Sequence, residues 1–484
     1  MRKNLKVLMV FPEIAPFVRT GLVGDIGGIL PKVLKDLGND VRVVSPQYHV
    51  INERKYILRD VIRLRDIEIP LGRESVKINV KSAFVPNSKV QVYFVNYRPF
   101  FSKNGLYKDA RRGGYFKDND KRFILFSKSV METLIRLQWQ PDIVHCHDWQ
   151  TGLIPFFLRY LYNKDDFFNN ISSVFTVYDS NFQGSFPSEC LSYMGLNGDF
   201  EYNDKILNNK GECSFLKAGI VNADVVTTID RKIGEKFISP LNFHTIRNGI
   251  DYNIWSPEKD RFIVQHYNNN DLKGKEKNKR YILEKNGLKL HQDFPLISII
   301  DSLMGREGFE LVTSILDEII KEDIYLMIFG ASDKKIYQKL MNIQKANPEK
   351  MVIGPSLDNK LMHNVIAGSD FLLIPAIPEK DGLRSFIGLK YGTIPLIGIG
   401  DKENGIFGKL DMDSGNAFEF LFEKMNGKNL LETLRRALNS YRDKKFWSRF
   451  VKNTMQEDFS WQIVAKEYLE LYESCAGSKN TSDS

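Results

Sequence analysis

Blocks of apolar residues separated by polar turns run through the chain, and the first of them predicts a strand, a helix and a second strand. Residues 7–11 form an apolar run of a buried strand's length, and residues 29–37 carry apolar side chains at helical spacing before Gly38. A second apolar run begins at Val41. We therefore expect the chain to open with a strand, a turn, a helix and a parallel strand.

The same alternation continues through the first half of the sequence. Helical spacing of apolar residues predicts helices at 121–138 and 215–222. Short apolar or alternating runs predict strands at 76–85, 89–95, within 141–152, 173–177 and 225–229. Strands that alternate with helices at this interval indicate a parallel, doubly wound α/β sheet.

A turn-rich segment at 251–257 separates this half from a second α/β series, and we interpret it as a hinge. The first domain then spans 1–250 and the second 258–458, two Rossmann-like halves that face each other. An amphipathic helix is expected within 459–476, and residues 477–484 read as a disordered tail. The strands expected in the second half lie at 296–300, 324–329, 351–353, 371–374 and 394–397.

Length and composition agree with two globular domains. The chain has 484 residues, too many for one core, with 43% hydrophobic and 26% charged residues. Its formal net charge of +8 is scattered except for the run at 273–280, which we interpret as a solvated loop because it has no interleaved aromatic residues. A mild basic excess suits a small anionic ligand, and we expect no nucleic-acid partner.

The cysteines and the apolar runs indicate a cytoplasmic protein. Pro12 and Glu13 interrupt the apolar start before any cleavage site for a signal peptide. Eighteen apolar residues never run together, so no membrane span is expected. The four cysteines are too sparse for a disulfide framework and read as reduced thiols: Cys146, Cys190, Cys213 and Cys475.

Several glycines follow the first strand, in the segment 19–28 (RTGLVGDIGG). Glycines let backbone amides approach a ligand, and a helix start favours an anion, so the segment is a candidate phosphate or sugar-phosphate site. The alternative is that these glycines serve tight packing. The dinucleotide fingerprint G-x-G-x-x-G is absent.

A short strand within 141–152 ends in the segment His145-Cys146-His147-Asp148. Strand ends line the ligand crevice of open α/β sheets, which makes His145, His147 and Asp148 candidates for function. The alternative is that one histidine caps a helix and the other packs. No third ligand stands at a recognisable spacing, so we expect no metal site.

A set of motifs stands in order along the chain: RTGLVGD, HCHDWQTGL, NFQGSFP, RNGIDYNIWSP, PEKDGLRSFIGLKYGTIPLIG and DFSW. This ordered set resembles the bacterial glycogen synthase and plant starch synthase family over almost the entire chain. The resemblance implies the GT-B fold, with a cleft between two Rossmann-like domains and a final helix that crosses back to the first. It implies retaining transfer of glucose from a nucleotide sugar, usually ADP-glucose, to an α-1,4-glucan, without a metal or other cofactor.

The resemblance also assigns roles to individual residues. His147 would meet the sugar near the reacting carbon, Glu379 would hold the donor glucose, and Glu13 would belong to the acceptor side. The remaining positions would contact the donor: Gly21, Gly24 and Asp25 beside its phosphates and glucose, Arg19 as the retained cation of that loop, and the amides of Asp381, Gly382 and Leu383 around the distal phosphate.

Several positions depart from the family pattern where the donor would bind. The arginine and lysine of the family's second domain are Ser302 and Glu307, and its His-Asn pair is Tyr178-Asp179. A charge-assisted hydrogen bond contributes about 1.5–3 kcal/mol, so two lost cations would remove roughly 3–6 kcal/mol. That loss corresponds to a rate lower by a factor on the order of 10² to 10⁴.

Three new cations, Arg306, Lys380 and Arg384, lie near the same motifs and leave room for an altered donor. Arg384 stands at an expected helix N-terminus and could bind a phosphate there. The alternative is that it is a solvated helix residue. Two hypotheses therefore stand: a glycosyltransferase with weakened or altered activity, and a non-catalytic relative. The second would bind glucan and act as a regulatory partner, for example of an active synthase paralogue.

Overall fold

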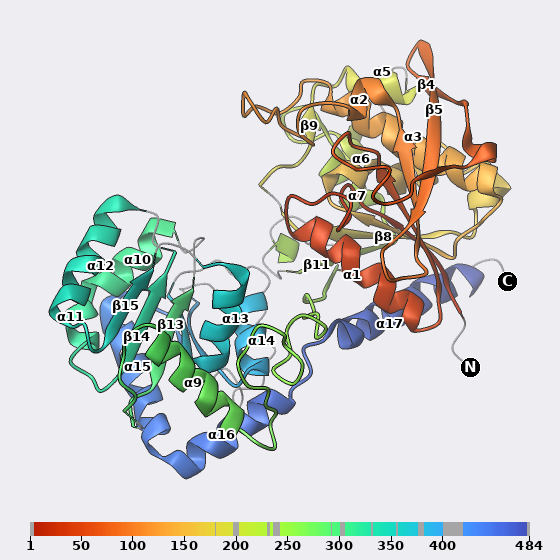
Figure 1. Ribbon diagram of the computed structural model, residues 1–484. Coiled ribbons are helices and arrows are strands. Elements are labelled where there is room, and N and C mark those ends of the chain that lie inside the picture. Colours follow the sequence, from red (N-terminus) through yellow and green to blue (C-terminus); the bar gives the residue numbers. More distant parts are fainter. Residues whose placement is uncertain are drawn as a thin grey trace. The chain divides into compact units, whose positions relative to one another are not determined.

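The computed structural model describes residues 4–179, 181–196, 203–229, 233–235, 243–291, 293–300, 305–330, 333–354, 357–375, 382–399 and 420–481. The chain divides into two compact units (Figure 1). The N-terminal unit contains residues 1–247 and 464–484, and the C-terminal unit contains residues 248–463. Within the described residues, no helix is both long and apolar enough to cross a membrane.

The N-terminal unit is built on one sheet whose strands follow the order β12-β11-β8-β7-β1-β2-β6-β5-β3, with β4 paired to β5. The strands from β12 to β6 are parallel, whereas β3, β4 and β5 pair antiparallel at one edge. The parallel strands are β1 (Lys6–Val10), β2 (Asp40–Pro46), β6 (Gln91–Asn96), β7 (Ile143–His147), β8 (Ser172–Val177), β11 (Val225–Thr228) and β12 (Phe243–Thr245). The antiparallel strands are β3 (Arg59–Asp60), β4 (Ile67–Leu71) and β5 (Glu74–Phe84).

The central strands are buried along their whole length because helices cover both faces of the sheet. Helix α4 contacts both α3 and α7, and α1 and α17 lie on the other side of the sheet (Figure 1). The helices of this unit are α1 (Leu22–Asp36), α2 (Arg98–Phe101), α3 (Asn119–Leu137), α4 (Leu153–Tyr160), α5 (Cys190–Met194), α6 (Asn203–Ile206) and α7 (Phe215–Asn222). Smaller elements are η1 (Ile62–Leu64), η2 (Trp149–Thr151), η3 (Asp166–Phe168) and the pair β9 (Ser185–Phe186) and β10 (Cys213–Ser214).

Helix α1 begins at Leu22, seven residues before the start that the apolar spacing predicted. Its first turns contain Gly24, Gly27 and Gly28, which hide the helical periodicity from a search for apolar side chains. A Cβ at Gly28 would lie 2.7 Å from the carbonyl oxygen of Ala15, and one at Gly27 would lie 2.9 Å from that of Glu13. These two glycines therefore serve close packing of the helix against the preceding segment.

Helix α17 (Trp461–Thr481) runs beyond the predicted amphipathic stretch and includes residues 477–481, which the sequence assigned to the tail. Tyr472 and Cys475 of α17 are buried. The carbonyl oxygen of Cys475 accepts a hydrogen bond from Ser172 Oγ at 3.2 Å, and Tyr472 Oη lies 2.6 Å from Nδ1 of His145. These contacts hold α17 against β7 and β8 as far as Cys475.

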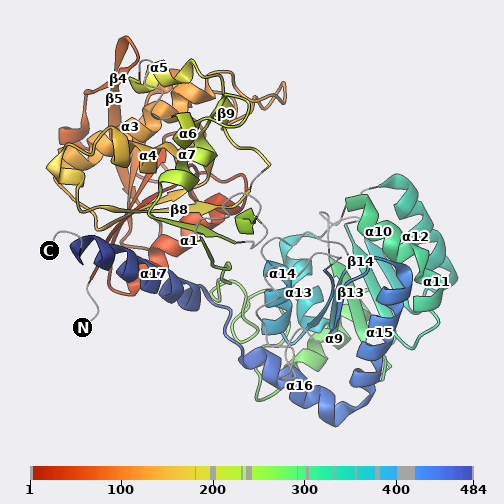
Figure 2. The ribbon, with the colours of Figure 1, turned by 180° about the vertical axis from the view of Figure 1, so that it is seen from behind.

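The C-terminal unit has a parallel six-stranded sheet in the order β15-β14-β13-β16-β17-β18. This order is that of a Rossmann sheet, with a reversal between β13 and β16. Figure 2 shows this sheet from the reverse side, with α10, α11 and α12 gathered beside β14. The strands are β13 (Leu296–Ile300), β14 (Tyr325–Phe329), β15 (Met351–Gly354), β16 (Phe371–Ile374), β17 (Ile394–Gly398) and β18 (Leu421–Phe422).

The helices of the C-terminal unit bury their apolar sides against this sheet. They are α9 (Lys273–Lys285), α10 (Gly305–Ser314), α11 (Leu316–Ile319), α12 (Lys334–Ala346), α13 (Asn359–Gly368), α14 (Leu383–Lys390), α15 (Gly427–Arg442) and α16 (Lys444–Gln456). The two larger sheets, each parallel around its centre, establish the α/β class that the sequence predicted.

The prediction of a solvated loop at 273–280 is wrong, because this run forms the first part of α9 and two of its lysines are buried. Lys279 Nζ lies 2.7 Å from the carboxylate of Asp370, and Lys275 Nζ donates to the carbonyl oxygen of Tyr391 at 2.9 Å. Burial lowers the pKa of Lys275 to about 7. The charges are tolerated in the interior because residues distant in sequence supply oxygen partners.

Candidate functional site

The strand order of the N-terminal unit reverses between β1 and β7, since β2 continues on one side and β8 on the other. The carboxyl ends of strands at such a reversal form the ligand crevice of open α/β sheets. The segment from Phe11 to Asp25 follows β1, and His147 with Asp148 ends β7. Tyr178 and Asp179 follow the neighbouring strand β8. The topology thus places the candidates of this unit at one edge of the sheet.

Phe11 connects the carboxyl ends of β1 and β7. Its ring stacks on the imidazole of His147, with centroids 3.7 Å apart and an interplanar angle of 9°. On α1, a Cβ at Gly27 would lie 3.2 Å from Cδ1 of the same ring. His147 and the glycine-containing start of α1 therefore share one packed neighbour.

Glu13 is buried, and its carboxylate holds the turn that precedes α1. Oε1 accepts hydrogen bonds from Thr20 Oγ1 at 2.7 Å and from Tyr107 Oη at 2.8 Å, and Oε2 accepts from the backbone N–H of Thr20. Gly24 packs here as well, because its Cβ would lie 3.3 Å from Oε2 of Glu13. Glu13 thus positions the backbone around Thr20 with both of its oxygens.

Gly21 differs from the other glycines of this segment. It is the N-cap of α1, and within the described residues no atom lies within 4 Å of a Cβ built there. Its φ of −172° is extended backbone that any residue can adopt. A side chain at this position would therefore meet no neighbour among the described residues, and the N-terminus of a helix favours an anionic group.

Arg19 and Asp25 form an ion pair across this turn, with Nη1 and Oδ1 3.1 Å apart. The Arg19 side chain is 63% exposed and that of Asp25 is 38% exposed. Burial raises the pKa of the Asp25 carboxyl, against the lowering effect of Arg19. The one cation that the sequence retains in this loop is therefore already engaged with a carboxylate.

His147 is fully buried at the end of β7. Its Nδ1 lies 2.9 Å from Tyr178 Oη, and Nε2 has no hydrogen-bond partner within the part of the chain that the structure describes. Burial, and in second place the neighbouring His145, hold the pKa of this imidazole well below its ordinary value. A neutral histidine with one nitrogen held and the other unpartnered is suited to hydrogen-bond a ligand.

His145 has a different environment. Its Nδ1 lies 2.6 Å from Tyr472 Oη and its Nε2 lies 2.6 Å from Thr176 Oγ1, so both ring nitrogens are satisfied. Burial lowers its pKa to about 3. The packing alternative considered for the two histidines therefore describes His145.

Asp148 carries the most strained backbone of this edge, with φ of +61° and ψ of 175°. Its side chain is buried, and Oδ1 has no hydrogen-bond partner among the described residues. Burial raises the pKa of this carboxyl to about 7, and the nearby charges of Asp179 and Glu13 contribute in the same direction. Strain and an unsatisfied buried oxygen at a strand end are features of functional sites.

Two loops that carry aromatic residues meet beside these residues. Tyr115 and Phe182 stack with centroids 4.0 Å apart at 6°, and Phe182 packs edge-on against Trp149 at 5.1 Å. Trp149 also lies 6.2 Å from the ring of Tyr107, the partner of Glu13. Tyr115 is 42% exposed, so the stack reaches the surface.

The C-terminal unit shows part of its predicted site. Gly382 is the N-cap of α14 with φ of +62°, a left-handed conformation that favours glycine, and Leu383 and Arg384 are the first two helical residues. The helix start that the sequence predicted next to Arg384 is therefore present. Ser302, Glu379 and Asp381 lie outside the described residues, as do the side chains of Arg306 and Glu307.

Among the described residues, no three His, Cys, Asp or Glu side chains come together as a group that could hold a metal ion. At the carboxyl edge of the N-terminal sheet, Nε2 of His147 and Oδ1 of Asp148 are among the buried polar atoms that have no hydrogen-bond partner in the described chain. Together with the open N-cap at Gly21, this edge can donate hydrogen bonds to a ligand and stabilise positive charge on it.

Comparisons with known proteins cover the whole chain. Residues 6–245 match the family model described as the starch synthase catalytic domain. The glycogen synthases of Chlorobaculum tepidum and Chlorobaculum parvum are 34% and 33% identical, each over 98% of this chain and 100% of theirs. The catalytic domain of starch synthase IV from Arabidopsis thaliana, solved with ADP and acarbose, is 24% identical and has the same fold, with a TM-score of 0.77 over 98% of this chain and 100% of that one.

Proposed function

This chain belongs to the glycogen and starch synthase family of glucosyltransferases with the GT-B fold, and from that membership we propose its substrates. The donor is a nucleotide sugar, with ADP-glucose as the first candidate, and the acceptor is the non-reducing end of an α-1,4-glucan. Transfer proceeds with retention at the anomeric carbon and without a metal cofactor. The protein acts in the cytoplasm.

The observation that supports this proposal most directly is the pair of unpartnered polar atoms at the end of β7. His147 Nε2 and Asp148 Oδ1 are buried and have no partner within the described chain. In glucosyl transfer the sugar becomes cationic as the nucleoside diphosphate departs. A neutral imidazole can hydrogen-bond a sugar hydroxyl, and carboxylates near it stabilise the positive charge that develops.

The carboxylates at the carboxyl edge of the N-terminal sheet provide a negative electrostatic potential that stabilises that positive charge. Glu13 and Asp179 both raise the pKa of Asp148, which places the three groups within electrostatic reach of one another. The leaving diphosphate requires the opposite environment. In the N-terminal unit, the open N-cap at Gly21 offers backbone amides to an anionic group. In the C-terminal unit, the N-terminus of α14 at Leu383 and Arg384 offers backbone amides of the same kind.

We further propose that donor turnover is weaker than in an ordinary synthase, or that the donor is altered. Tyr178 and Asp179 stand where the family has histidine and asparagine, and Ser302 and Glu307 stand where it has an arginine and a lysine. Arg306, Lys380 and Arg384 supply cations at other positions of the same motifs. Glu379 retains the position that would hold the donor glucose.

A second candidate function is glucan binding without catalysis, in partnership with an active synthase paralogue. The observation that favours it is the exposed stack of Tyr115 on Phe182, since a flat aromatic surface is suited to pack against a sugar ring. This surface lies in the N-terminal unit and does not depend on the donor positions that differ from the family.

A single experiment separates the two functions. The purified chain is incubated with glycogen and radiolabelled ADP-glucose or UDP-glucose, and incorporation into glycogen is measured beside an authentic synthase. The proposed weakened transferase gives slow but measurable incorporation that disappears in a His147→Ala variant. Complete absence of incorporation with every donor, together with retained co-sedimentation on glycogen, would favour the binding function.

A further inference from the structure

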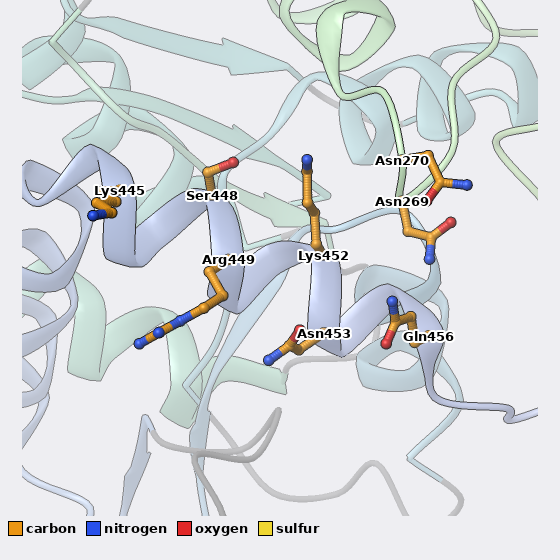
Figure 3. Close-up of a pocket in the computed structure, with 8 residues that line it drawn as sticks. All are labelled: Asn269, Asn270, Lys445, Ser448, Arg449, Lys452, Asn453 and Gln456. Carbon is orange, nitrogen blue, oxygen red and sulfur yellow. The ribbon is translucent and has the colours of Figure 1, made fainter.

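A polar groove lies on the exposed side of α16 in the C-terminal unit, and its lining includes no residue that was assigned a role above. Its volume is about 480 Å³, which falls in the range of small-molecule sites. Lys445, Ser448, Arg449 and Lys452 of α16 line it together with Asn269 and Asn270 from the loop before α9 (Figure 3). Figure 3 shows Ser448 and Lys452 projecting on one side of the helix and Arg449 on the other.

Every charged residue of α16 is positive. The helix contains Lys444, Lys445, Arg449 and Lys452 and neither Asp nor Glu, so its four positive charges equal half of the chain's net charge of +8. Among the described residues, the three cations of the groove pair with no carboxylate. The neighbouring helix α15 differs, because its Arg435 and Arg442 both pair with Glu322.

The opposite side of α16 is anchored in the core of the unit. Trp447, Phe450 and Val451 are buried, and the Trp447 ring lies 4.9 Å from that of Phe371 on β16. The basic side chains therefore extend from a helix whose position is set by packing. Lys445, Arg449 and Lys452 stand four and three residues apart, so their side chains leave the backbone from one face of the helix, from which Arg449 and Lys452 then extend in different directions (Figure 3).

The chemistry of the lining indicates the class of ligand. Unpaired cations attract a phosphate group, and arginine binds it with two parallel hydrogen bonds. Carboxamides hydrogen-bond hydroxyl groups as donors and acceptors, and Asn453 and Gln456 add two more of them. The lining contains no aromatic ring on which a nucleobase could stack and no carboxylate that would repel an anion.

We propose that this groove binds a phosphorylated sugar, with the phosphate on Lys445, Arg449 and Lys452 and the sugar hydroxyls on the carboxamides. Its lining shares no residue with the positions that would bind the nucleotide sugar. A nucleotide sugar is made by joining a sugar phosphate to a nucleotide, so the ligand belongs to the class of compounds from which the proposed donor derives. Its binding would couple this protein to the supply of that donor.

Isothermal titration calorimetry of the full chain at low salt tests the proposal with glucose 6-phosphate, glucose 1-phosphate, inorganic phosphate and glucose as separate probes. At least one sugar phosphate should bind about tenfold or more tightly than inorganic phosphate, and glucose should not bind. The variant Arg449→Gln/Lys452→Gln should weaken that binding on the order of tenfold per cation. The matched control Lys428→Gln/Arg436→Gln removes two exposed cations from α15 and should leave it unchanged.

Several results would overturn the proposal. Equal affinity for inorganic phosphate and the sugar phosphates would mean an adventitious ion only, and equal losses in both double variants would mean unspecific attraction to a basic surface. Absence of heat with every sugar phosphate would also refute it. ADP-glucose binding is measured in the same variants and should not change, so failure of this site and failure of the proposed transferase are read separately.

Discussion

Tyr178 Oη lies 2.9 Å from Nδ1 of His147, so a residue that departs from the family pattern holds one that retains it. Tyr178 follows β8 and His147 ends β7, and the pairing of these parallel strands brings the two side chains together. Both are buried. The hydroxyl leaves only Nε2 of the imidazole for a ligand, so the substitution restricts the way in which this histidine can act.

The first prediction concerns this contact. Tyr178→Phe should lower the free energy of unfolding by about 1–3 kcal/mol, because Nδ1 of a buried imidazole loses its partner. Urea unfolding followed by fluorescence measures the change. Tyr337→Phe is the control, since no hydrogen bond of the Tyr337 hydroxyl is seen within the described chain and the side chain is only half-buried. Equal stability of Tyr178→Phe and the wild type would show that the contact contributes nothing.

The second prediction restores the lost donor cations. Ser302→Arg with Glu307→Lys should tighten ADP-glucose binding by at least about tenfold, since each charge-assisted hydrogen bond contributes about 1.5–3 kcal/mol. Calorimetric titration gives the dissociation constant. Ser314→Arg with Glu318→Lys makes the same change of charge at exposed positions and should have little effect. If both double variants behave alike, Ser302 and Glu307 do not belong to the donor site.

The third prediction is a pH dependence caused by Asp148. Its pKa is raised from 3.8 to about 7 in the folded state, so the folded protein binds more protons than the unfolded chain between these values. Asp148 therefore destabilises the fold increasingly as pH rises through this window, up to about 4 kcal/mol at 1.36 kcal/mol per pKa unit.

Asp148→Asn removes this ionisation. Relative to the wild type, the variant should be more stable at pH 8, with the difference shrinking towards pH 4, as measured by urea unfolding across that range. Asp36→Asn, at the exposed end of α1, should track the wild type at every pH. A stability difference that does not vary with pH would contradict the assignment.

The fourth prediction separates two glycines of the segment 19–28. Gly28→Ala should destabilise the protein by about 1–2 kcal/mol, because its Cβ meets the Ala15 carbonyl oxygen at 2.7 Å and the strain outweighs the gain in helix propensity. Gly21→Ala should leave stability nearly unchanged, since the space there is open. Thermal unfolding compares the two, and the opposite ranking would invalidate the packing described for α1.

The fifth prediction concerns the aromatic stack at the surface. Tyr115→Ala should weaken co-sedimentation with glycogen several-fold if the stack receives a sugar ring. Phe84→Ala removes another exposed aromatic, 60% exposed on β5, and should bind glycogen as the wild type does. Loss of binding in both variants, or in neither, would exclude a specific role for Tyr115.

The sequence by itself predicted most of the strands well, and several bounds agree to the residue. Strands β13 at Leu296–Ile300 and β16 at Phe371–Ile374 coincide with the predicted runs, because buried parallel strands are continuous apolar segments that end at polar turns. The family could be identified in the same way, since its motifs are local strings of residues. Local patterns therefore determined the α/β class and the GT-B resemblance.

The predictions of secondary structure were wrong where contacts with residues distant in sequence determine the structure. The run 273–280 reads as a solvated loop until Asp370 and the Tyr391 carbonyl, more than ninety residues away, accept its buried lysines. The glycines of α1 conceal a helix because their role is to let residues 13–15 approach it. Neither interaction leaves a periodic signal in the sequence.

The two histidines show the same division most clearly. The sequence placed His145 and His147 together at a strand end and left both open to function or packing. Only the tertiary structure separated them, by setting Tyr472 and Thr176 on the two nitrogens of His145 while leaving Nε2 of His147 without a partner in the described chain. The physical reason is that hydrogen-bond satisfaction depends on neighbours 31 and 327 residues away, which only the folded chain brings into contact.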